Sequence, residues 1–581
     1  MHTIKAGPLK VQSPLSVQGL CALGVLALGC GIRLALILAG WPHTNFDEGT
    51  IGQMAMNIAL HGEHPAFFYG QDYMGSLQAY LGAAFFHLFG VSLLSLRLGT
   101  VLLDTLFLIS MYALARLLYP PGMALLSTLL LGLASVMIYY REIQAIGGYP
   151  ETLLFGALLF TLASWLALTA RQAHVSRRGQ LARLLAYTAW GMAAGLGLWS
   201  NLLVLPYIFC AGLLLLVTCW RDLRSLAPLF LLLGVVIGGL PLILYNFQPG
   251  SHANSLDIVL FLFHGGAGAP NYTLQRLLPR SIPSAVLVGI PTMTSYPSVC
   301  SVSSTLYLGG KGPAALQCAV TQGAWSIFWI ALWLCATVLA ILGILDARRS
   351  KADKVAGDGA ETSEDTAAAA ERWQAYARNC ACLALLLALA LTVVLYVVSP
   401  ASVIQPYLNA RYLFCLQIGI PALIYPLWCW ASLTPYDRWV NMLRVMFGRV
   451  MLIALTLVLA LATVLTFADI PGTLAMNAQQ QDLVQRLEHI GAFHIYSDFM
   501  SCDRIEFQSY ERITCSDLLP NLQPVGDRYK PNGLIVRSDP LSSYVFPVGS
   551  PQVSAVAQKF KQEGQMYHEY LFDGYVVYQP E

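Results

Sequence analysis

The sequence predicts a mainly helical protein that crosses a membrane many times and ends in a small α/β domain. Hydrophobic residues occupy 56% of the 581 positions, charged residues only 11%, and the mean hydropathy is +0.60. Long apolar runs recur, and each must be a helix because lipid offers the backbone no hydrogen-bond partner. After residue 468 the sequence changes to the mixed texture of a water-soluble domain. The formal net charge of +2 gives no sign of a nucleic-acid partner.

About eleven apolar runs have the length of a membrane span, which needs roughly 20 residues. They cover residues 18–40, 92–118, 122–140, 151–170, 184–200, 202–219, 227–245, 324–345, 380–398, 411–431 and 449–468. The run over residues 76–89 is too short to span, so we expect an interfacial or re-entrant helix there. These segments make residues 1–468 a transmembrane domain.

Basic residues gather in alternate connections between the predicted spans. They are Lys5, Lys10, Arg116, Arg171, Arg177, Arg178, Arg183, Arg221, Arg224, Arg348, Arg349, Lys351, Lys354, Arg438, Arg444 and Arg449. Since short cytoplasmic loops carry the excess of Lys and Arg, the N-terminus is expected inside. The first loop, residues 246–323 and the C-terminal segment are then outside. Residues 346–379 become a cytoplasmic linker, with a helical second half.

The cysteines fit this orientation. Four of the 13 lie outside the predicted spans, namely Cys300, Cys318, Cys502 and Cys515. They fall in pairs in the two large outer segments, and an even number in an oxidising compartment favours disulfides from Cys300 to Cys318 and from Cys502 to Cys515. Four free thiols are the alternative.

Residues 469–581 are predicted to form an extracytoplasmic α/β domain. Apolar positions follow helical spacing up to Ile490, and the short β-like "FHIYS" comes next. The segments "NGLIVRSD", "SSYVFPV" and "DGYVVYQP" follow, with a helix expected over residues 553–562.

The stretch "HTNFDEGTIGQ" places Asp47 and Glu48 side by side directly after the first predicted span, with no Lys or Arg near them in sequence. A charge at the bilayer centre costs about 2.5–3.5 kcal/mol on insertion scales, so both residues are expected at the membrane edge. One interpretation is structural: Asp47 caps the next helix, and Glu48 in its first turn interacts favourably with the helix dipole.

The neighbouring polar residues favour a reaction centre instead. The first loop continues with His61, Glu63, His64 and Asp72 among aromatic residues, and the second outer loop, "YYREIQAIGGYPET", supplies further ionisable groups. These are Arg141, Glu142 and Glu151, together with Tyr149. Two outer loops thus place acids at one membrane level, as an interfacial acid/base or metal site requires.

The late segment "YLNARYLF" adds a cation at that level. Arg411 has no acid near it in sequence, so its guanidinium is a candidate for binding a phosphate with two hydrogen bonds, with Tyr412 at the headgroup belt. An arginine that extends to the interface without binding phosphate is the alternative.

The order of "FDEG", "YGQDYMGSLQAYLGAAFFHLFG" and "ARYLF" after an N-terminal span resembles the type-C membrane glycosyltransferases. These include the protein O-mannosyltransferases and the aminoarabinose transferases of lipid A, and the resemblance covers residues 1–470. It implies a polyprenyl-phosphate sugar donor and an acidic first-loop residue at the active site. Carried onto this chain, it makes Asp47 the general base, with Glu48 beside it.

The second loop departs from the family pattern, which often has an aspartate at the start of the fourth span. Glu151 takes that place in this chain, and Glu142 is the second choice. Some members bind a divalent metal near the donor phosphate, for which His61, Glu63 and His64 are candidates although they lack a specific metal-binding spacing. The candidates for the donor phosphate are Arg411, Tyr412 and Arg141, and those for contacting substrate are Tyr69, Gln71, Asp72, Tyr73 and Tyr149.

These expectations describe a hexosyl- or pentosyltransferase of the cell membrane. It would take a sugar from a lipid-linked phosphate and pass it to a lipid, glycan or protein acceptor on the extracytoplasmic side. A transporter or flippase of a lipid-linked saccharide is the alternative, and a non-catalytic scaffold is a third reading. The acids cluster at one face and no internal repeat is evident, which favours the enzyme.

Overall fold

The computed structural model describes residues 16–171, 177–248, 254–263, 273–355, 363–433 and 439–581. Lys5, Lys10 and Arg438, three of the residues that suggested the orientation, lie outside them. The chain divides into two compact units, which we describe separately. The helical unit comprises the residues up to Ile32, Leu103–Tyr139 and Tyr149–Thr466. The loop-and-lobe unit comprises Arg33–Leu102, Tyr140–Gly148 and Phe467–Glu581.

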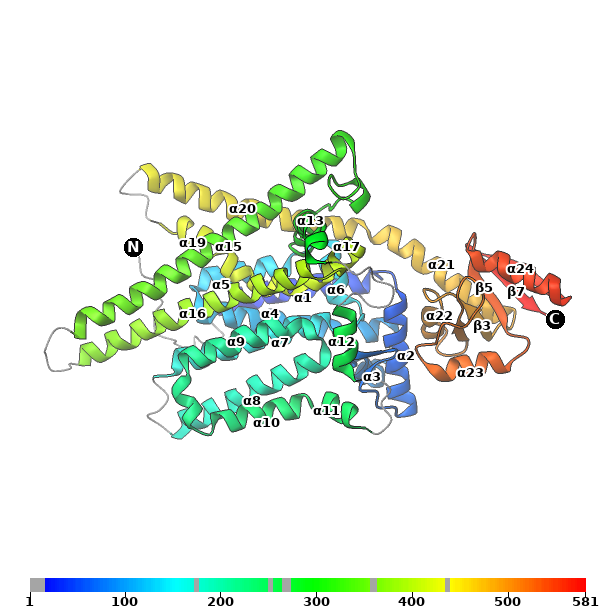
Figure 1. The fold of residues 1–581 in the computed structure, drawn as a ribbon, viewed down its shortest axis with the longest axis horizontal. Coiled ribbons are helices and arrows are strands. Elements are labelled where there is room, and N and C mark those ends of the chain that lie inside the picture. Colours follow the sequence, from blue (N-terminus) through cyan, green and yellow to red (C-terminus); the bar gives the residue numbers. More distant parts are fainter. Residues whose placement is uncertain (1–15, 172–176, 249–253, 264–272, 356–362, 434–438) are drawn as a thin grey trace. The chain divides into compact units, whose positions relative to one another are not determined.

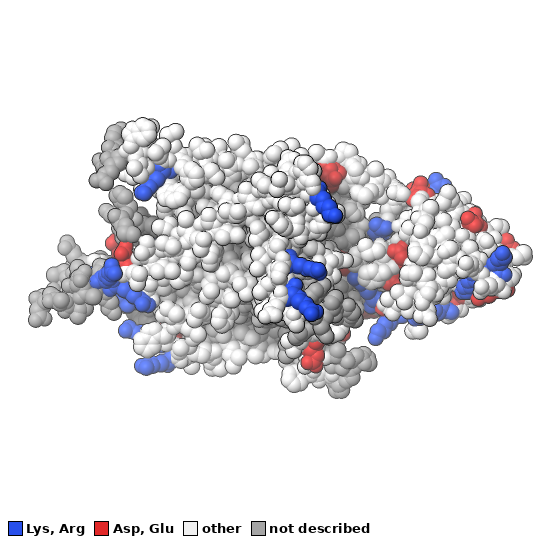
Figure 2. Space-filling model, turned by 45° about the horizontal axis from the view of Figure 1, so that its top comes forward, with Lys and Arg blue, Asp and Glu red and all other residues white. Residues whose placement is uncertain are grey.

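The helical unit is built mainly from apolar helices near the predicted runs (Figure 1), and it also contains helices within residues 246–323, which were expected as an outer loop. Its longer helices are α1 (Val17–Leu38), α4 (Leu93–Leu118), α5 (Pro121–Gly132), α7 (Tyr149–Thr169), α8 (Arg177–Ser200), α9 (Leu205–Thr218), α10 (Ala227–Gly238), α13 (Leu274–Ser284), α15 (Gly312–Val355), α16 (Ser363–Val398), α19 (Ile420–Ala431) and α20 (Trp439–Ala468). Shorter ones are α6 (Val136–Ile143), α11 (Leu240–Phe247), α12 (Ser255–Phe263), α14 (Ile290–Met293), α17 (Ala401–Ile404) and α18 (Pro406–Asn409). The middle of this unit's visible face carries almost no charge in Figure 2.

The described residues contain seven helices long and apolar enough to cross a membrane, or up to nine if each of two bent pairs forms one span. Residues 122–140 and 227–245, each expected as one straight span, form those pairs. Helices α5 and α6 meet at 86°, and α10 and α11 meet at 65°. The second bend lies at Gly239 and Pro241, where glycine weakens the helix and proline lacks an amide hydrogen.

Glycines bring α8 and α10 into close contact. Both helices carry two glycines four residues apart, Gly191 with Gly195 and Gly234 with Gly238. A Cβ atom at Gly191 would lie 2.1 Å from the Leu231 carbonyl oxygen, and one at Gly234 would lie 2.1 Å from that of Thr188. The absence of side chains therefore allows the two backbones to touch, as in the small-residue crossings of membrane helices.

The first loop, residues 39–92, folds as two helices and a short hairpin. Helix α2 (Phe46–His61) is followed by strands β1 (Phe67–Phe68) and β2 (Gln71–Gly75), which pair antiparallel, and by α3 (Leu77–Phe89). Helix α3 is the short helix expected over residues 76–89. Asn45, rather than Asp47, caps α2, because its side-chain oxygen accepts a hydrogen bond from the Glu48 amide at 2.8 Å.

The C-terminal lobe, residues 470–581, contains helices and a small sheet, within the segment 469–581 that was expected to be an α/β domain. Its elements are α21 (Ile470–His489), β3 (His494–Ser497), α22 (Cys502–Gln508), β4 (Thr514–Asp517), α23 (Lys530–Ser538), β5 (Ser543–Pro547), α24 (Pro551–Glu563), β6 (Tyr567–Phe572) and β7 (Tyr575–Pro580). The strand order is β4-β3-β5-β7-β6. Strand β3 runs parallel to β4 and β5, and β7 runs antiparallel to β5 and β6.

Both faces of this sheet are covered, as the alternation of side chains along β5 and β7 requires. Val545 and Val577 pack on one face with residues of α21 and α22. Phe546 and Tyr578 pack on the other face with α24, mainly against Phe560. The sheet is therefore the middle layer of three.

The structure confirms both expected disulfides. Cys300 bonds to Cys318 in the helical unit, and Cys502 bonds to Cys515 in the lobe. The second bond joins the first residue of α22 to β4. It therefore closes the β3-α22-β4 crossover beside the first loop's contacts with the lobe, which are described next.

Candidate active site

The candidate site lies in the loop-and-lobe unit, at the N-terminal turn of α2. The Asn45 cap starts the helix, and Asp47 and Glu48 occupy its first turn, where the positive end of the helix dipole favours carboxylates. The Asn45 amide also donates to the Tyr140 hydroxyl at 2.9 Å, which ties the start of α2 to residues 140–148. The two adjacent acids then project into different surroundings.

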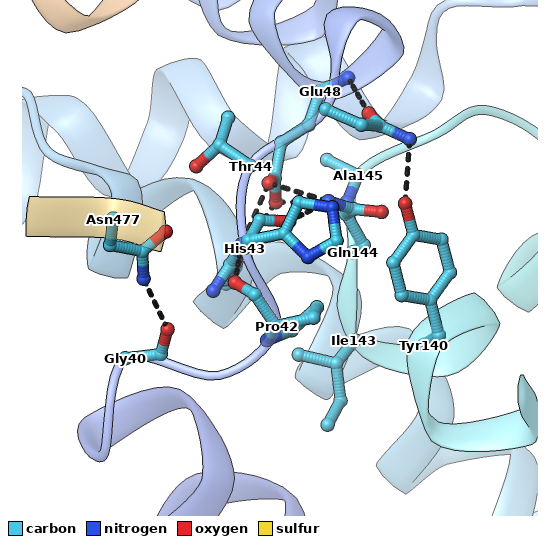
Figure 3. A network of polar contacts seen from close by, with 12 residues as sticks. Gly40, Pro42, His43, Thr44, Glu48, Tyr140, Ile143, Gln144, Ala145 and Asn477 are labelled. Atoms are coloured by element: carbon cyan, nitrogen blue, oxygen red, sulfur yellow. Dashed lines mark hydrogen bonds and ion pairs between the residues drawn. The ribbon is translucent and has the colours of Figure 1, made fainter. Parts of the chain in front are cut away.

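Glu48 is fully buried, and both of its oxygens are occupied (Figure 3). Arg97 of α4 donates from Nε to Oε1 at 2.8 Å and from Nη2 to Oε2 at 2.7 Å. Gln144 adds a hydrogen bond to Oε2 at 3.0 Å. Arg97 and Gln144 also donate to the Pro42 and His43 carbonyl oxygens, at 2.7 and 2.8 Å. Glu48 thus holds the turn before α2 against α4 and residues 140–148.

Glu142 is likewise paired and buried. Its Oε2 accepts a hydrogen bond from Arg33 Nη2 at 2.7 Å, and neither side chain is more than 2% exposed. Arg33 lies in the last turns of α1, which ends at Leu38. Arg33 therefore compensates the charge of Glu142, at a place other than the first turn of α2.

Asp47 differs from both. Its side chain is 17% exposed, and its Oδ1 accepts a hydrogen bond from Arg528 Nη2 at 2.9 Å. Arg528 comes from the lobe, between β4 and α23. Within the described part of the chain, Oδ2 of Asp47 forms no hydrogen bond. Of the two adjacent acids, only Asp47 therefore presents a carboxylate oxygen that is not already bound.

Arg528 is held on all sides. Its guanidinium lies 4.7–5.1 Å from the ring centres of Phe46, Phe68 and Phe499. Nη1 donates to the Thr50 hydroxyl at 2.6 Å and lies 3.8 Å from the Asp503 carboxylate, which accepts a hydrogen bond from the same hydroxyl. The side chain is only 7% exposed. Aromatic faces and carboxylates together stabilise this buried cation.

Two glycines of "DEGTIG" allow the lobe to reach α2. A Cβ atom at Gly49 would lie 2.6 Å from the backbone of Asp503, and one at Gly52 would lie 2.4 Å from the Phe507 ring. Both contacts are with α22, which packs along α2. The glycines thus remove the side chains that would separate the two helices.

The described residues contain no group of three or more His, Cys, Asp or Glu side chains that could hold a metal, so His61, Glu63 and His64 do not form one. Glu63 accepts hydrogen bonds from the Tyr69 and Tyr529 hydroxyls at 2.5 and 2.6 Å instead. His61 lies 3.2 Å from Glu511 of the lobe. In the described part of the chain, these three residues therefore do not fit the divalent metal expected of them.

The candidates for contacting substrate are divided between the two units. Gln71, Asp72 and Tyr73 lie on β2, where the Tyr73 hydroxyl donates to Gln71 at 3.1 Å, and Tyr69 lies two residues before this strand. Arg141 belongs to the same unit, and its guanidinium lies 5.5 Å from the Tyr140 ring centre.

Tyr149, Glu151, Arg411 and Tyr412 belong to the helical unit. Tyr149 and Glu151 are buried in the first turn of α7, and the Arg411 guanidinium lies 5.4 Å from the Tyr412 ring centre.

Burial shapes the electrostatics of the lobe beside Arg528. It raises the pKa of Asp503 to about 6, although Arg528 and the Thr50 hydroxyl act in the opposite direction. It also raises the pKa of Asp517 to about 8, with Asp503 and Asp527 adding to the effect. On the loop side, burial and then Arg504 lower the pKa of His43. Arg528 is thus close to several carboxylates that burial makes harder to ionise.

Sequence reasoning missed Arg97 and Arg528, the partners of the two adjacent acids. Arg97 had a signal, because it interrupts the apolar run over residues 92–118, and an ionisable residue there needs a partner. Arg33 carries the same signal in the run over residues 18–40. Arg528 had none, since it lies in a polar connection 481 residues from Asp47.

Comparison with known proteins identifies the fold. No protein-family model matches the chain, and no curated protein matches it. Among solved structures, the oligosaccharyltransferase of Archaeoglobus fulgidus in the apo form matches 90% of this chain and 69% of its own, at 13% identity and a TM-score of 0.51. ArnT from Cupriavidus metallidurans, bound to undecaprenyl phosphate, matches 97% of both chains at 13% identity and a TM-score of 0.48. The likeness to the oligosaccharyltransferase shows that the chain shares the fold of that structure.

Proposed function

We propose that the protein is a membrane glycosyltransferase that moves a sugar from a polyprenyl-phosphate donor to an acceptor hydroxyl. The observation that carries the proposal is the placement of Asp47: in a fold shared with an oligosaccharyltransferase, it is the member of the adjacent acid pair that keeps an oxygen available to a substrate. A lipid-anchored donor also explains a site where the chain leaves its first apolar helix. The isoprenoid tail would stay in the bilayer while the sugar reaches α2.

In this mechanism Asp47 is the general base. The acceptor oxygen attacks the anomeric carbon, and its proton passes to the Asp47 carboxylate. The bond from that carbon to the phosphate oxygen breaks, and polyprenyl phosphate leaves with the bonding electrons. General base assistance typically contributes about 10²–10⁴-fold to a rate, so Asp47 accounts for a large part of the catalysis.

The other acids take supporting roles in the proposal. Glu48 and Glu142 each neutralise a buried arginine, which supports a role in holding the loop rather than in proton transfer. Glu151, at the start of α7, remains the proposed second acid. Arg411, Tyr412 and Arg141 are proposed to bind the donor phosphate, whose departing charge a guanidinium stabilises.

We place the site and the lobe on the extracytoplasmic side of the cell membrane. The charge asymmetry of the loops supports this orientation. The two disulfides lie in segments that it puts outside, where an oxidising compartment preserves them. The donor sugar is proposed to be a hexose or a pentose, passed to a lipid, glycan or protein acceptor.

The test uses the purified full chain in lipid bilayers with a polyprenyl phosphate carrying a radiolabelled sugar and membranes that supply acceptors. We expect label to leave the lipid and appear on an acceptor. The bent pairs α5–α6 and α10–α11 favour the alternative, a transporter of lipid-linked saccharide, because transporters use broken helices. Label that is bound or moved across the bilayer on intact donor lipid would support that alternative and contradict the enzyme.

A further inference from the structure

We infer that Arg528 of the C-terminal lobe is a positioning residue for Asp47, so that the lobe completes the active site. The inference rests on the proposed function, in which Asp47 is the base. It assigns the lobe a part in the reaction and does not require the lobe to touch either substrate.

Arg528 is located where α/β domains usually present functional residues. Strands β4, β3 and β5 are parallel, and β3 lies between the other two, so the chain passes from β3 to β4 on one side and then crosses β3 to reach β5 on the other. Ligands of such sheets bind beyond the carboxyl ends of the strands at this reversal. In this protein, Phe499 follows β3 and Arg528 follows β4, and both contact the first turn of α2. The functional edge of the lobe is thus directed at Asp47.

The contact is built to fix one carboxylate oxygen. Three rings and the Thr50 hydroxyl hold the guanidinium, and its remaining edge donates to Oδ1 of Asp47. A base must be held within about 0.5 Å of its productive geometry, and a shift of about 1 Å can cost roughly 10²-fold in rate. Pinning Oδ1 leaves Oδ2 as the oxygen that meets the acceptor.

The same ion pair could serve only to attach the lobe, and the structure allows the two roles to be separated. The lobe contacts the first loop elsewhere, through Tyr529 with Glu63 at 2.6 Å and through Phe507, which stacks on Phe86 with ring centres 6.5 Å apart. Trp41 also donates to Asp469 at 2.9 Å. Attachment therefore does not depend on Arg528 alone.

The test compares Arg528→Met with two controls in the full chain. Tyr529→Phe removes an attachment contact one residue away, and Arg512→Gln removes an exposed arginine of the lobe paired with Glu488. Limited proteolysis reports whether the lobe stays attached, and kcat and KM are measured with the radiolabelled donor. We expect Arg528→Met to lower kcat by roughly ten- to a hundredfold with a smaller change in KM. Both controls should stay within about twofold of the parent, since neither touches Asp47.

A double variant gives a measurement that a purely structural role would not affect. Because Arg528 acts through Asp47, adding Arg528→Met to Asp47→Asn should cause no further loss of kcat. The inference would be overturned if Arg528→Met and Tyr529→Phe lost kcat equally. It would also be overturned if Arg528→Met lowered kcat as much in the Asp47→Asn protein as it does in the parent. A parental kcat in Arg528→Met would overturn it as well. If Arg528→Met detaches the lobe, the same measurement is made on Arg528→Lys, with the lobe shown by proteolysis to be attached. A tenfold loss of kcat in Arg528→Lys supports the inference, and an unchanged kcat overturns it. Parental activity in Asp47→Asn would instead contradict the proposed function itself.

Discussion

Arg528 Nη2 lies 2.9 Å from Asp47 Oδ1, and this ion pair joins residues 481 positions apart in the chain. The next residue, Glu48, is neutralised by Arg97, only 49 positions away. Two adjacent carboxylates thus receive one cation each, from the lobe and from α4. In the proposed mechanism, Glu48 therefore holds the loop while Asp47 accepts the proton.

The Glu48 pair is expected to be essential for stability. Arg97→Met leaves a buried carboxylate without its counter-charge, and breaking a buried pair from one side typically costs about 3–5 kcal/mol. The thermal midpoint of the detergent-purified protein should therefore fall markedly. Arg444→Met, an exposed change on α20, is the matched control and should leave the midpoint unchanged. Equal thermal midpoints in the two variants would show that the folded protein tolerates a buried Glu48 without Arg97 as its counter-charge.

The close packing of α2 and α22 predicts an unusual sensitivity to one methyl group. Gly49→Ala places a Cβ atom 2.6 Å from the Asp503 backbone, which no side-chain movement can relieve, and such overpacking typically costs about 1–3 kcal/mol. Hydrogen exchange of the amides of α22 should accelerate. Gly472→Ala is the control, because nothing lies within 4 Å of a Cβ atom there. Unchanged exchange in Gly49→Ala would contradict the packing described above.

The lobe should be more stable in mild acid than at alkaline pH. Burial raises the pKa of Asp517 to about 8, whereas an unfolded aspartate titrates near about 3.9. The folded state therefore binds more protons across this window, and stability declines as the pH rises from about 4 to 8. Asp517→Asn should flatten the decline measured by pulse proteolysis between pH 5 and 8. Glu563→Gln, an exposed change on α24, should preserve it; identical slopes in all three proteins would refute the assignment.

The crossing of α8 and α10 gives a prediction for the helical unit. Gly191→Leu forces a side chain into the space of the Leu231 carbonyl, so the helix pair must separate. We expect the yield of monodisperse protein to fall severely. Gly24→Leu, in α1 with no atom within 4 Å, should be tolerated. Similar yields for both variants would mean that the crossing is not tight.

The parts of the structure that sequence reasoning predicted depend on local pattern. The apolar runs predicted most of the long helices, the even cysteine counts predicted both disulfides, and the segment "SSYVFPV" expected in the α/β domain became β5. The bends at residues 133–135 and 239 were missed because an apolar run indicates the length of a helical segment but not where its two halves change direction. Asn45 was missed as the cap because three polar residues in "TNFDE" are acceptable caps, and only the backbone selects among them.

The site was harder to predict because its partners come from distant segments. The sequence showed Asp47 and Glu48 without a nearby cation, and both proved to be paired. The family resemblance made His61, Glu63 and His64 candidate metal ligands without a specific spacing, and lobe residues contact two of them, Glu63 and His61, instead. Arg33 and Arg97 could have been read as the buried partners of acids, since a charge inside an apolar run needs one.

The most direct test of the central claim is the initial rate of sugar transfer by Asp47→Asn. Asparagine keeps the shape of the side chain but cannot accept the proton, so we expect the rate to fall by about 10²–10⁴-fold in a folded protein. Asp482→Asn, which changes an exposed acid on α21 paired with Arg486, is the matched control and should keep the parental rate. A parental rate in Asp47→Asn would contradict the account of this protein as a glycosyltransferase with Asp47 as its base.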